Sequence, residues 1–182
     1  MILSDRTIFE LVESHKLVIE PEFDKKNIRP TGIRFHLGAD LLIPMAGQTV
    51  DLTQSDDLNY NTIILSEEGY ILKPGGFVLG HTYERIQVPR NIVVTLDGRS
   101  TAARVGLSIH CTSLTADGNF ETPNAITLEL KNEGNFNIVL KPKIPVGMFI
   151  FHQLTQEISQ DVQSQYKKQF TVLPPNLGGQ LK

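Results

Sequence analysis

The sequence predicts a mainly-β protein with the architecture of a β-sandwich or jelly roll, preceded by one N-terminal helix. Short apolar runs, most of them alternating with polar residues, recur at roughly even spacing along the chain. Turns rich in glycine and proline separate these runs, as is typical of sheets built from consecutive short strands. The 182 residues are 40% hydrophobic, which suffices for a globular core. We therefore expect one domain over residues 1–182, with a flexible C-terminal tail from about residue 159.

The N-terminal helix is expected to begin after Ser4. Serine is a good N-cap, and Asp5 suits the first turn because the helix dipole is positive there. Ile8, Leu11 and Val12 recur on one helical face, which predicts that this face packs on the core.

The strands are predicted from the alternation of apolar and polar residues. Ile33, Phe35 and Leu37 show this alternation, and we expect the run 41–43 to continue their strand as far as Pro44. Further strands are expected at 63–65, 70–72, 77–84, 86–88, 92–96, 107–111, 126–132, 137–140 and 148–151. Polar loops are expected at 27–32, 51–61 and 115–124, and the polar segment 155–169 is expected to be partly helical.

Charge and cysteine content exclude several classes of protein. The net charge of -3 gives no basic field for nucleic acid or for an anionic membrane surface. No apolar run approaches the roughly 20 residues that cross a bilayer, and the N-terminus lacks the pattern of a signal peptide. Cys111 is the single cysteine, so the chain can form neither an internal disulfide nor a zinc site on paired cysteines. We expect a cytoplasmic protein without nucleic-acid or membrane partners, and no metal site on its five histidines.

The stretch from Asp97 to Leu107 is a candidate site for an anionic ligand. We expect Asp97 and Gly98 to end the preceding strand. Two arginines and two hydroxyl residues follow within six positions: Arg99, Ser100, Thr101 and Arg104. Guanidinium groups offer forked donors for phosphate oxygens, and hydroxyl groups can orient a water molecule. The alternative is a surface turn that leads into a short helix with solvated arginines.

Glu129 is a candidate proton carrier on a strictly alternating strand. Ile126, Leu128 and Leu130 share one face of this strand, whereas Thr127 and Glu129 share the other. From the pattern alone, the favoured interpretation of Glu129 is an exposed carboxylate at a sheet edge.

Two other residues have structural interpretations. Cys111 lies on an alternating strand and is expected to be a small buried hydrophobic residue rather than a nucleophile. Asp117 precedes Gly118, a pair that is typical of a turn.

Four segments of the chain together resemble the dCTP deaminase family of the trimeric dUTPase-like superfamily. They are residues 2–6, 72–79, 99–107 and 126–132, and the resemblance runs in order from Ile2 to about Gln169. The arginine–serine segment and the Leu-Glu-Leu strand are specific as a pair. The resemblance implies a distorted jelly roll of the dUTPase-like type, assembled as a homotrimer with active sites between neighbouring subunits.

The same resemblance implies an activity and a set of site residues. The activity is hydrolytic deamination of dCTP to dUTP and ammonia without zinc, with Mg²⁺ accompanying the triphosphate. Glu129 would be catalytic together with Ser100 and Arg104. The nucleotide would be bound by residues of the central segment, the strand and the tail, namely Arg99, Ser100, Thr101, Arg104, Asp117, Thr127, Leu128, Tyr166 and Gln169.

Zinc-free deamination needs a carboxylate that takes a proton from water and delivers it to the ring and the leaving amine. Partial burial of Glu129 would raise its pKa, whereas an ion pair with Arg104 would lower it. The two effects compete, and the sequence leaves their balance open.

The chain also departs from the family pattern. Arg34 stands where an acidic residue is usual, and Gln165 stands where a phosphate-binding lysine is common. The loop at 117–125 is about two residues longer than usual. Two alternatives therefore stay open. One is a dUTP diphosphatase, or both reactions in one site with Asp117 activating water, and the other is a non-catalytic, nucleotide-binding regulatory trimer.

Overall fold

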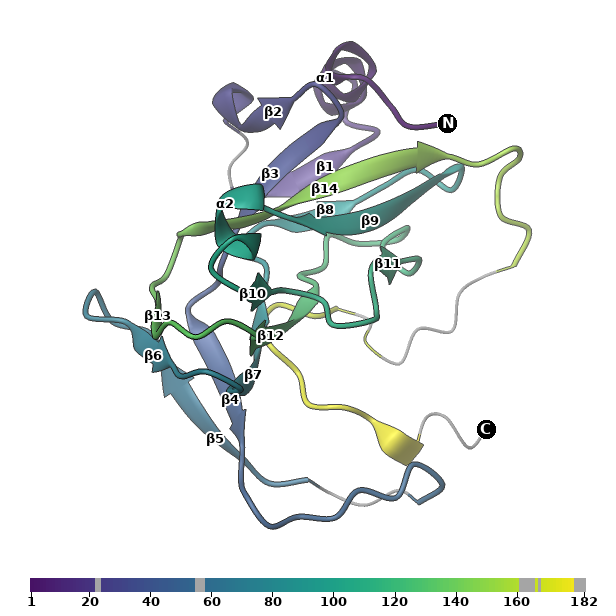
Figure 1. Cartoon of the computed structure of the whole chain (residues 1–182). Helices are drawn as coiled ribbons and strands as arrows, with labels where there is room; N and C mark the ends of the chain where they lie inside the picture. The colour runs from purple at the N-terminus through teal and green to yellow at the C-terminus, as the bar shows by residue number, and fades with distance from the viewer. Residues whose placement is uncertain (22–23, 55–57, 161–165, 167, 179–182) are drawn as a thin grey trace.

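Two five-stranded antiparallel sheets form the body of the protein (Figure 1) in a computed structural model that describes residues 1–21, 24–54, 58–160, 166 and 168–178. The first sheet has the strand order β10 (Leu107–Ser108), β12 (Thr127–Asn132), β7 (Phe77–His81), β4 (Asp40–Pro44) and β5 (Tyr60–Ile64). The second has the order β11 (Thr115–Ala116), β9 (Ile92–Gly98), β14 (Pro145–Gln153), β3 (Gly32–His36) and β2 (Ile28–Arg29). The predicted mainly-β fold is confirmed.

Two short ribbons and three helical segments complete the fold. The ribbons pair β1 (Val18–Glu20) with β8 (Arg85–Gln87), and β6 (Tyr70–Leu72) with β13 (Ile138–Leu140). The helical segments are α1 (Asp5–Glu13), the 3₁₀ turn η1 (Lys25–Asn27) and α2 (Ser100–Ala103). No helix in the described ranges is both long and apolar enough to span a membrane.

The N-terminal helix forms as predicted and covers one side of the core. Ile8 is fully buried, and Leu11 and Val12 pack on the same core. Ser4 adopts the extended conformation of an N-cap, but its hydroxyl lies 3.5 Å from that of Thr7 and caps no backbone N–H group.

The core lies between the two sheets and is built by alternation. On β12, Leu128 and Leu130 are completely buried. On the facing sheet, the rings of Phe35 and Phe149 pack with their centroids 4.6 Å apart. Burying such side chains is the main stabilising contribution, at about 1.5–3 kcal/mol for each residue.

The strand predicted through residues 33–44 is in fact two strands in different sheets. β3 belongs to the second sheet and β4 to the first, and the chain passes from one to the other at Gly38. A Cβ atom at Gly38 would lie 2.1 Å from the His81 ring, so only glycine fits this crossing. The alternation of Ile33, Phe35 and Leu37 is real, but periodicity does not reveal a change of sheet.

Several predicted boundaries were also wrong. β9 runs on through Asp97 and Gly98, because both residues still pair with β14. The predicted loops at 27–32 and 115–124 contain the short strands β2 and β11. In the predicted helix at 155–169, the described residues are not helical, and the rest lies outside the described residues.

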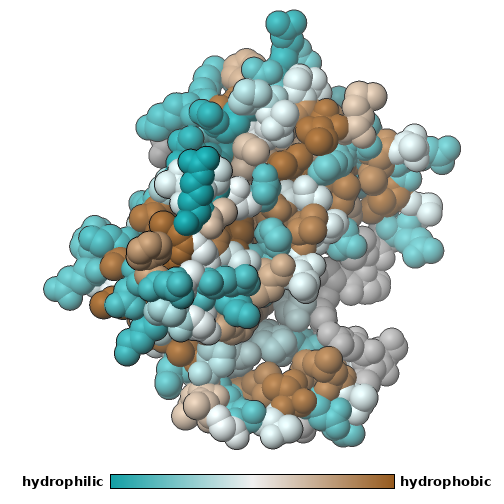
Figure 2. Space-filling model, in the orientation of Figure 1, coloured by the Kyte–Doolittle hydropathy of each residue, from teal (hydrophilic) through white to brown (hydrophobic). Residues whose placement is uncertain are grey.

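Some apolar side chains stay exposed on the strands of one side of the protein. They are Ile64 on β5, Ile71 on β6 and Val139 on β13, joined by Phe136 just before β13. Figure 2 shows hydrophobic residues at the left-hand edge, on the side where Figure 1 places these strands.

The buried Asn132 fastens the end of β12 to the β6–β13 ribbon. Its Nδ2 donates to the carbonyls of Leu72 (2.9 Å) and Phe136 (2.7 Å), and its Oδ1 accepts the N–H of Gly134 (3.0 Å). Asn132 is fully buried, so loss of its side-chain amide would leave several polar groups without a hydrogen-bond partner and away from water.

We predict that Asn132→Ala lowers the free energy of unfolding by about 2–4 kcal/mol, because it leaves buried carbonyl and N–H groups unpaired. Urea denaturation measures this difference. The same change at Asn137, which is exposed, is the matched control and should cost less than about 0.5 kcal/mol. Equal losses in the two variants would contradict the proposed role of Asn132.

Candidate active site

A cavity of about 490 Å³ lies beside β12 and is walled by three parts of the chain. The first sheet, the segment 113–127 and the C-terminal segment 166–175 all contribute to its lining. The sheet and β9 supply Tyr60, Phe77, Leu79, Leu96 and Glu129; the middle segment supplies Ser113, Thr115–Asn119 and Asn124–Thr127; the C-terminal segment supplies Tyr166, Gln169 and Leu173–Pro175. A cavity of this size accommodates a small-molecule ligand.

Glu129 enters this cavity because of the alternation of β12. Its neighbours Leu128 and Leu130 fill the core on the opposite face, and this fixes the direction of the Glu129 side chain. β12 lies between β10 and β7, so Glu129 stands in the interior of a sheet. The interpretation of Glu129 as an exposed carboxylate at a sheet edge is therefore wrong.

Burial makes Glu129 an unusual carboxyl group. Its Oε2 is buried and has no hydrogen-bond partner among the residues that the structure describes. Burial disfavours the charged form and raises the pKa of Glu129 to about 7. A carboxyl group with this pKa can both accept and donate a proton near neutral pH, as a general acid–base group requires.

The strand of Glu129 also contacts the C-terminal segment. Thr127 points to the same side as Glu129, and its hydroxyl accepts a hydrogen bond of 2.7 Å from Nε2 of Gln169. Gln169 is only 5% exposed. The structure therefore brings together four residues that the sequence assigned to one site: Asp117, Thr127, Tyr166 and Gln169, with Glu129 beside them.

The described part of the C-terminal segment packs against the body. Val172 is buried with Leu42 and Leu79, and the hydroxyl of Thr171 donates to Asp40 (2.8 Å). The hydroxyl of Tyr166 accepts the N–H of Asn176 (3.1 Å). These contacts place the described part of the segment at the cavity, and its role as a mobile lid stays a prediction.

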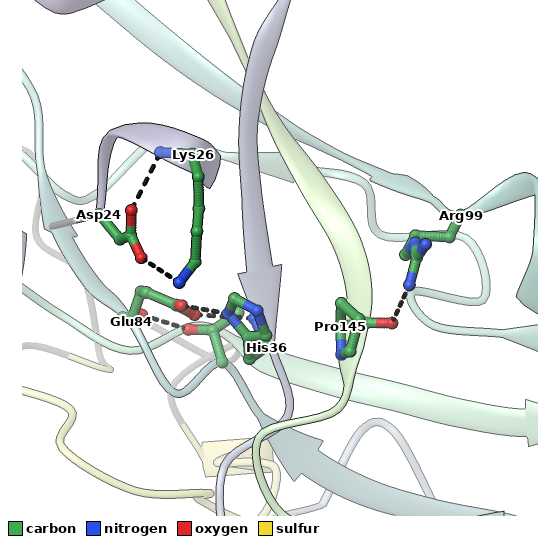
Figure 3. Close-up of polar contacts among 7 residues, drawn as sticks. Asp24, Lys26, His36, Glu84, Arg99 and Pro145 are labelled. Atoms are coloured by element: carbon green, nitrogen blue, oxygen red, sulfur yellow. Dashed lines mark hydrogen bonds and ion pairs between the residues drawn. The ribbon is translucent and has the colours of Figure 1, made fainter. Parts of the chain in front are cut away.

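The arginine–serine segment lies elsewhere in the chain. Arg99, Ser100, Thr101 and Arg104 lie on or beside α2, and none of them lines the cavity of Glu129. Arg99 donates to the carbonyl of Pro145 (3.2 Å). Figure 3 shows this contact beside β14, and at the end of β3 it shows the hydrogen bond between His36 and Glu84. Within one chain, the predicted catalytic residues thus form two separate groups.

Three other residues differ from expectation or lie outside the described chain. The side chain of Leu128 is fully buried in the core, and Leu128 is not among the residues that line the cavity. Cys111 was expected to be buried but is exposed, with a positive φ of 40° that ends the predicted strand. Its thiol donates to the carbonyl of Glu129 (3.5 Å). Gln165 lies outside the described residues.

Sequence patterns missed several cavity residues. Tyr60 and Phe77 line the cavity from β5 and β7, and Asn119 and Asn124 line it from the long loop. The aromatic residues looked like ordinary strand residues, and asparagines in a polar loop carry no signal of burial. In the described part of the chain, no three His, Cys, Asp or Glu side chains gather as metal ligands.

Comparison with known proteins assigns a family to this chain. A family model described as dCTP deaminase-like matches residues 2–154. The chain belongs to the dCTP deaminase-like family. A "dCTP deaminase, dUMP-forming" of Dictyoglomus turgidum is 37% identical over 160 aligned positions, covering 85% of this chain and 81% of the relative. A "dCTP deaminase" of Buchnera aphidicola is 34% identical over 192 aligned positions, covering 97% of this chain and 98% of the relative.

A solved structure agrees with this assignment at the level of the fold. The 2'-deoxycytidine 5'-triphosphate deaminase of Agrobacterium tumefaciens matches with a TM-score of 0.65 and 18% identity. The match covers 84% of this chain and 48% of that one. The family predicted from the sequence is thus confirmed. The relatives of this dCTP deaminase-like chain differ in the product that their names state.

We predict that Glu129→Gln stabilises the protein at pH 8 but not at pH 5. Between the ordinary pKa of 4.5 and the raised value of about 7, the folded protein holds a proton that the unfolded chain has lost. Stability therefore falls as pH rises through this window, and the cost is complete above about pH 7. Glutamine stays neutral and avoids the cost. Thermal melts of both proteins at the two pH values measure it, and a constant difference in Tm would contradict the raised pKa.

Proposed function

We propose that the protein deaminates dCTP to dUTP and ammonia, with Glu129 as the group that moves protons. The observation that carries this proposal is the buried, unpartnered carboxylate oxygen of Glu129, which lines a cavity large enough for a nucleoside. The names of the relatives support dCTP as the substrate.

The chemistry requires two proton movements. The deprotonated Glu129 takes a proton from the water that attacks C4 of cytosine and gives it to the ring nitrogen. The hydroxyl group now on C4 then gives its proton, through Glu129, to the amine. The C4–N bond breaks to release ammonia, and C4 keeps the oxygen as a carbonyl. A pKa of about 7 suits both directions of transfer, because the protonated and the deprotonated forms of Glu129 are both well populated at neutral pH.

The lining of the cavity suits a pyrimidine nucleoside. Phe77 and Tyr60 offer aromatic surface for a flat base. The hydroxyl group of Thr127 and the side-chain amide of Gln169 are polar groups for its edge. Asp117 also belongs to the lining and could bind a sugar hydroxyl. We propose that Mg²⁺ enters as part of the substrate, bound to its phosphates, since Mg²⁺ prefers phosphate oxygens and water.

One observation favours a second reaction in the same cavity. Asp117 and Glu129 both line it, so two carboxyl groups are available for two different hydrolyses. With Asp117 activating a second water, dUTP would be split to dUMP and diphosphate. The names of two relatives, one of them dUMP-forming, correspond to these two outcomes.

The deciding experiment is to incubate the purified protein with dCTP and Mg²⁺, and separately with dUTP and Mg²⁺, and to separate the products. Ammonia with dUTP supports deamination alone, and ammonia with dUMP and diphosphate supports both reactions. Conversion of dUTP without any conversion of dCTP would leave only the diphosphatase. Binding of nucleotide without turnover would leave a regulatory role.

We predict that Glu129→Gln lowers kcat for dCTP by about 10²–10⁴, because glutamine keeps the shape of glutamate but carries no transferable proton. In the parent protein, kcat/KM should rise with pH through an apparent pKa near 7, the value to which burial raises the pKa of Glu129. Steady-state ammonia release measures both effects. A variant as fast as the parent would show that Glu129 is not the proton carrier.

We propose further that the active protein is a homotrimer in which a neighbouring subunit completes the site. The arginine–serine segment lies outside the cavity lining, and its residues Ser100, Thr101 and Arg104 are exposed, so they are available to another copy of the chain. The exposed apolar side chains of β5, β6 and β13 are surface that association can cover. Arg99 and Arg104 of one subunit would then bind the phosphates of a nucleotide whose base lies beside Glu129 of the next.

A cytoplasmic location stays a prediction.

We predict that two inactive variants restore each other when they are expressed together. Glu129→Gln keeps an intact α2 segment, and Arg104→Ala keeps an intact cavity. In randomly mixed trimers, about a quarter of the shared sites would combine both intact parts. Ammonia release by the mixture should therefore approach a quarter of the parent rate. A mixture that stays as inactive as its components, although mass spectrometry shows mixed trimers, would contradict a shared site.

A further inference from the structure

The long loop at 117–125, where the chain departs from its family, is held in place by two buried asparagines. Asn119 and Asn124 are 7% and 6% exposed. Nδ2 of Asn119 donates to the carbonyls of Ile86 (3.1 Å) and Asn124 (3.3 Å). The backbone N–H and C=O of Asn124 both pair with Ile86, at 3.0 Å each. The loop is therefore fixed along β8 rather than free at the surface.

The side chain of Asn124 continues this network into the C-terminal segment. Its Nδ2 donates to the carbonyl of Thr122 (3.1 Å), and its Oδ1 accepts the backbone N–H of Gln169 (3.0 Å). The carbonyl of Gln169 accepts the N–H of Ala125 (2.9 Å), and its side chain donates to Thr127. The N–H, the carbonyl and the side-chain amide of Gln169 are thus all paired with residues 124–127.

Gln169 is where the C-terminal segment meets the strand that carries Glu129. Its partner Thr127 precedes Glu129 by two positions on the same face of β12, and all three line the cavity. The next residues that anchor the segment contact other strands: Thr171 bonds to Asp40 of β4, and Val172 packs against Leu42 of β4 and Leu79 of β7. If the Asn124 oxygen were lost, the buried N–H of Gln169 would lose the partner that it has in this structure, which makes the docked position unfavourable.

We propose that Asn124 is a positioning residue, which docks Gln169 and the C-terminal segment over the cavity. Its side-chain amide links the long loop to the segment that covers the site, and its backbone N–H and C=O tie the same residue to β8. In its effect on dCTP turnover this proposal rests on the proposed function, while the docking itself rests on the contacts alone.

Hydrogen exchange tests the docking without reference to activity. In the parent protein the amide protons of Gln169 and Ala125 should exchange slowly, because both are bonded and Gln169 is buried. Asn124→Ala should speed both by at least about tenfold, while the amides of the β9–β14 pair keep the parent rate. Asn124→Asp keeps an oxygen that accepts the Gln169 N–H and should restore its protection. Asn61→Ala, the same change at an exposed position of β5, is the control.

Kinetics with dCTP then test the effect on the site. Asn124→Ala should raise KM by about tenfold and change kcat by less than about threefold, since it loosens the cover of the site and leaves Glu129 in place. Fast exchange of Gln169 in the parent, or unchanged exchange in Asn124→Ala, would overturn the proposal whatever the activity. Uniformly faster exchange across β9 and β14 would also overturn it, because the role would then be general stability. A parent without dCTP turnover would refute the proposed function and leave the exchange result valid.

Discussion

The two-residue period of β12 is the constraint on which the candidate site depends. Leu128 and Leu130 are fully buried in the core, and strands β10 and β7 hold the strand on both sides. A shift of one residue would move Glu129 into the core and both leucines into the cavity, at a cost of several kcal/mol. The two leucines therefore hold the register of β12, and this register fixes the side of the sheet to which Glu129 points. Burial of the leucines, which stabilises the fold, thus also keeps the Glu129 carboxyl group in a poorly solvated position.

Features that depend on local periodicity were largely predictable from the sequence. Alternation located β12 and assigned Thr127 and Glu129 to one face, and the run of short strands predicted the mainly-β fold. Alternation cannot tell a central strand from an edge strand, because that depends on neighbours far away in sequence. The favoured interpretation of Glu129 as an edge carboxylate failed for this reason, and the resemblance to a family corrected it. The change of sheet at Gly38 could not be predicted, because it depends on the distant ring of His81.

The parts of the site that the sequence missed are held by polar contacts between distant segments. Asn124 looked like an ordinary loop residue, yet its amide binds a residue 45 positions further along the chain. Gln169 was assigned by resemblance, but only the structure shows that its N–H, its carbonyl and its side chain are all paired with residues 124–127. Contacts of this kind depend on where a loop folds back, and composition or spacing does not encode that position. The loop at 117–125 is thus tied through Asn124 to the C-terminal segment that lines the cavity.

The raised pKa of Glu129 constrains how an arginine can take part in the reaction. Within the described chain no hydrogen bond or ion pair joins Arg104 to Glu129, and burial is the main cause that holds the pKa at about 7. A guanidinium group at ion-pair distance would lower that pKa, so that Glu129 would be a weaker base and would hold the transferred proton less well. An arginine contributed by a neighbouring subunit is therefore useful if its donors face the phosphates and the reacting oxygen rather than Glu129. Under the proposed function, separation of the two groups within one chain would keep the carboxyl group basic until substrate arrives, and the negative charge of the substrate would then compete for the arginine. In the proposed shared site, the proton carrier and the anion-binding group would then work together without neutralising each other.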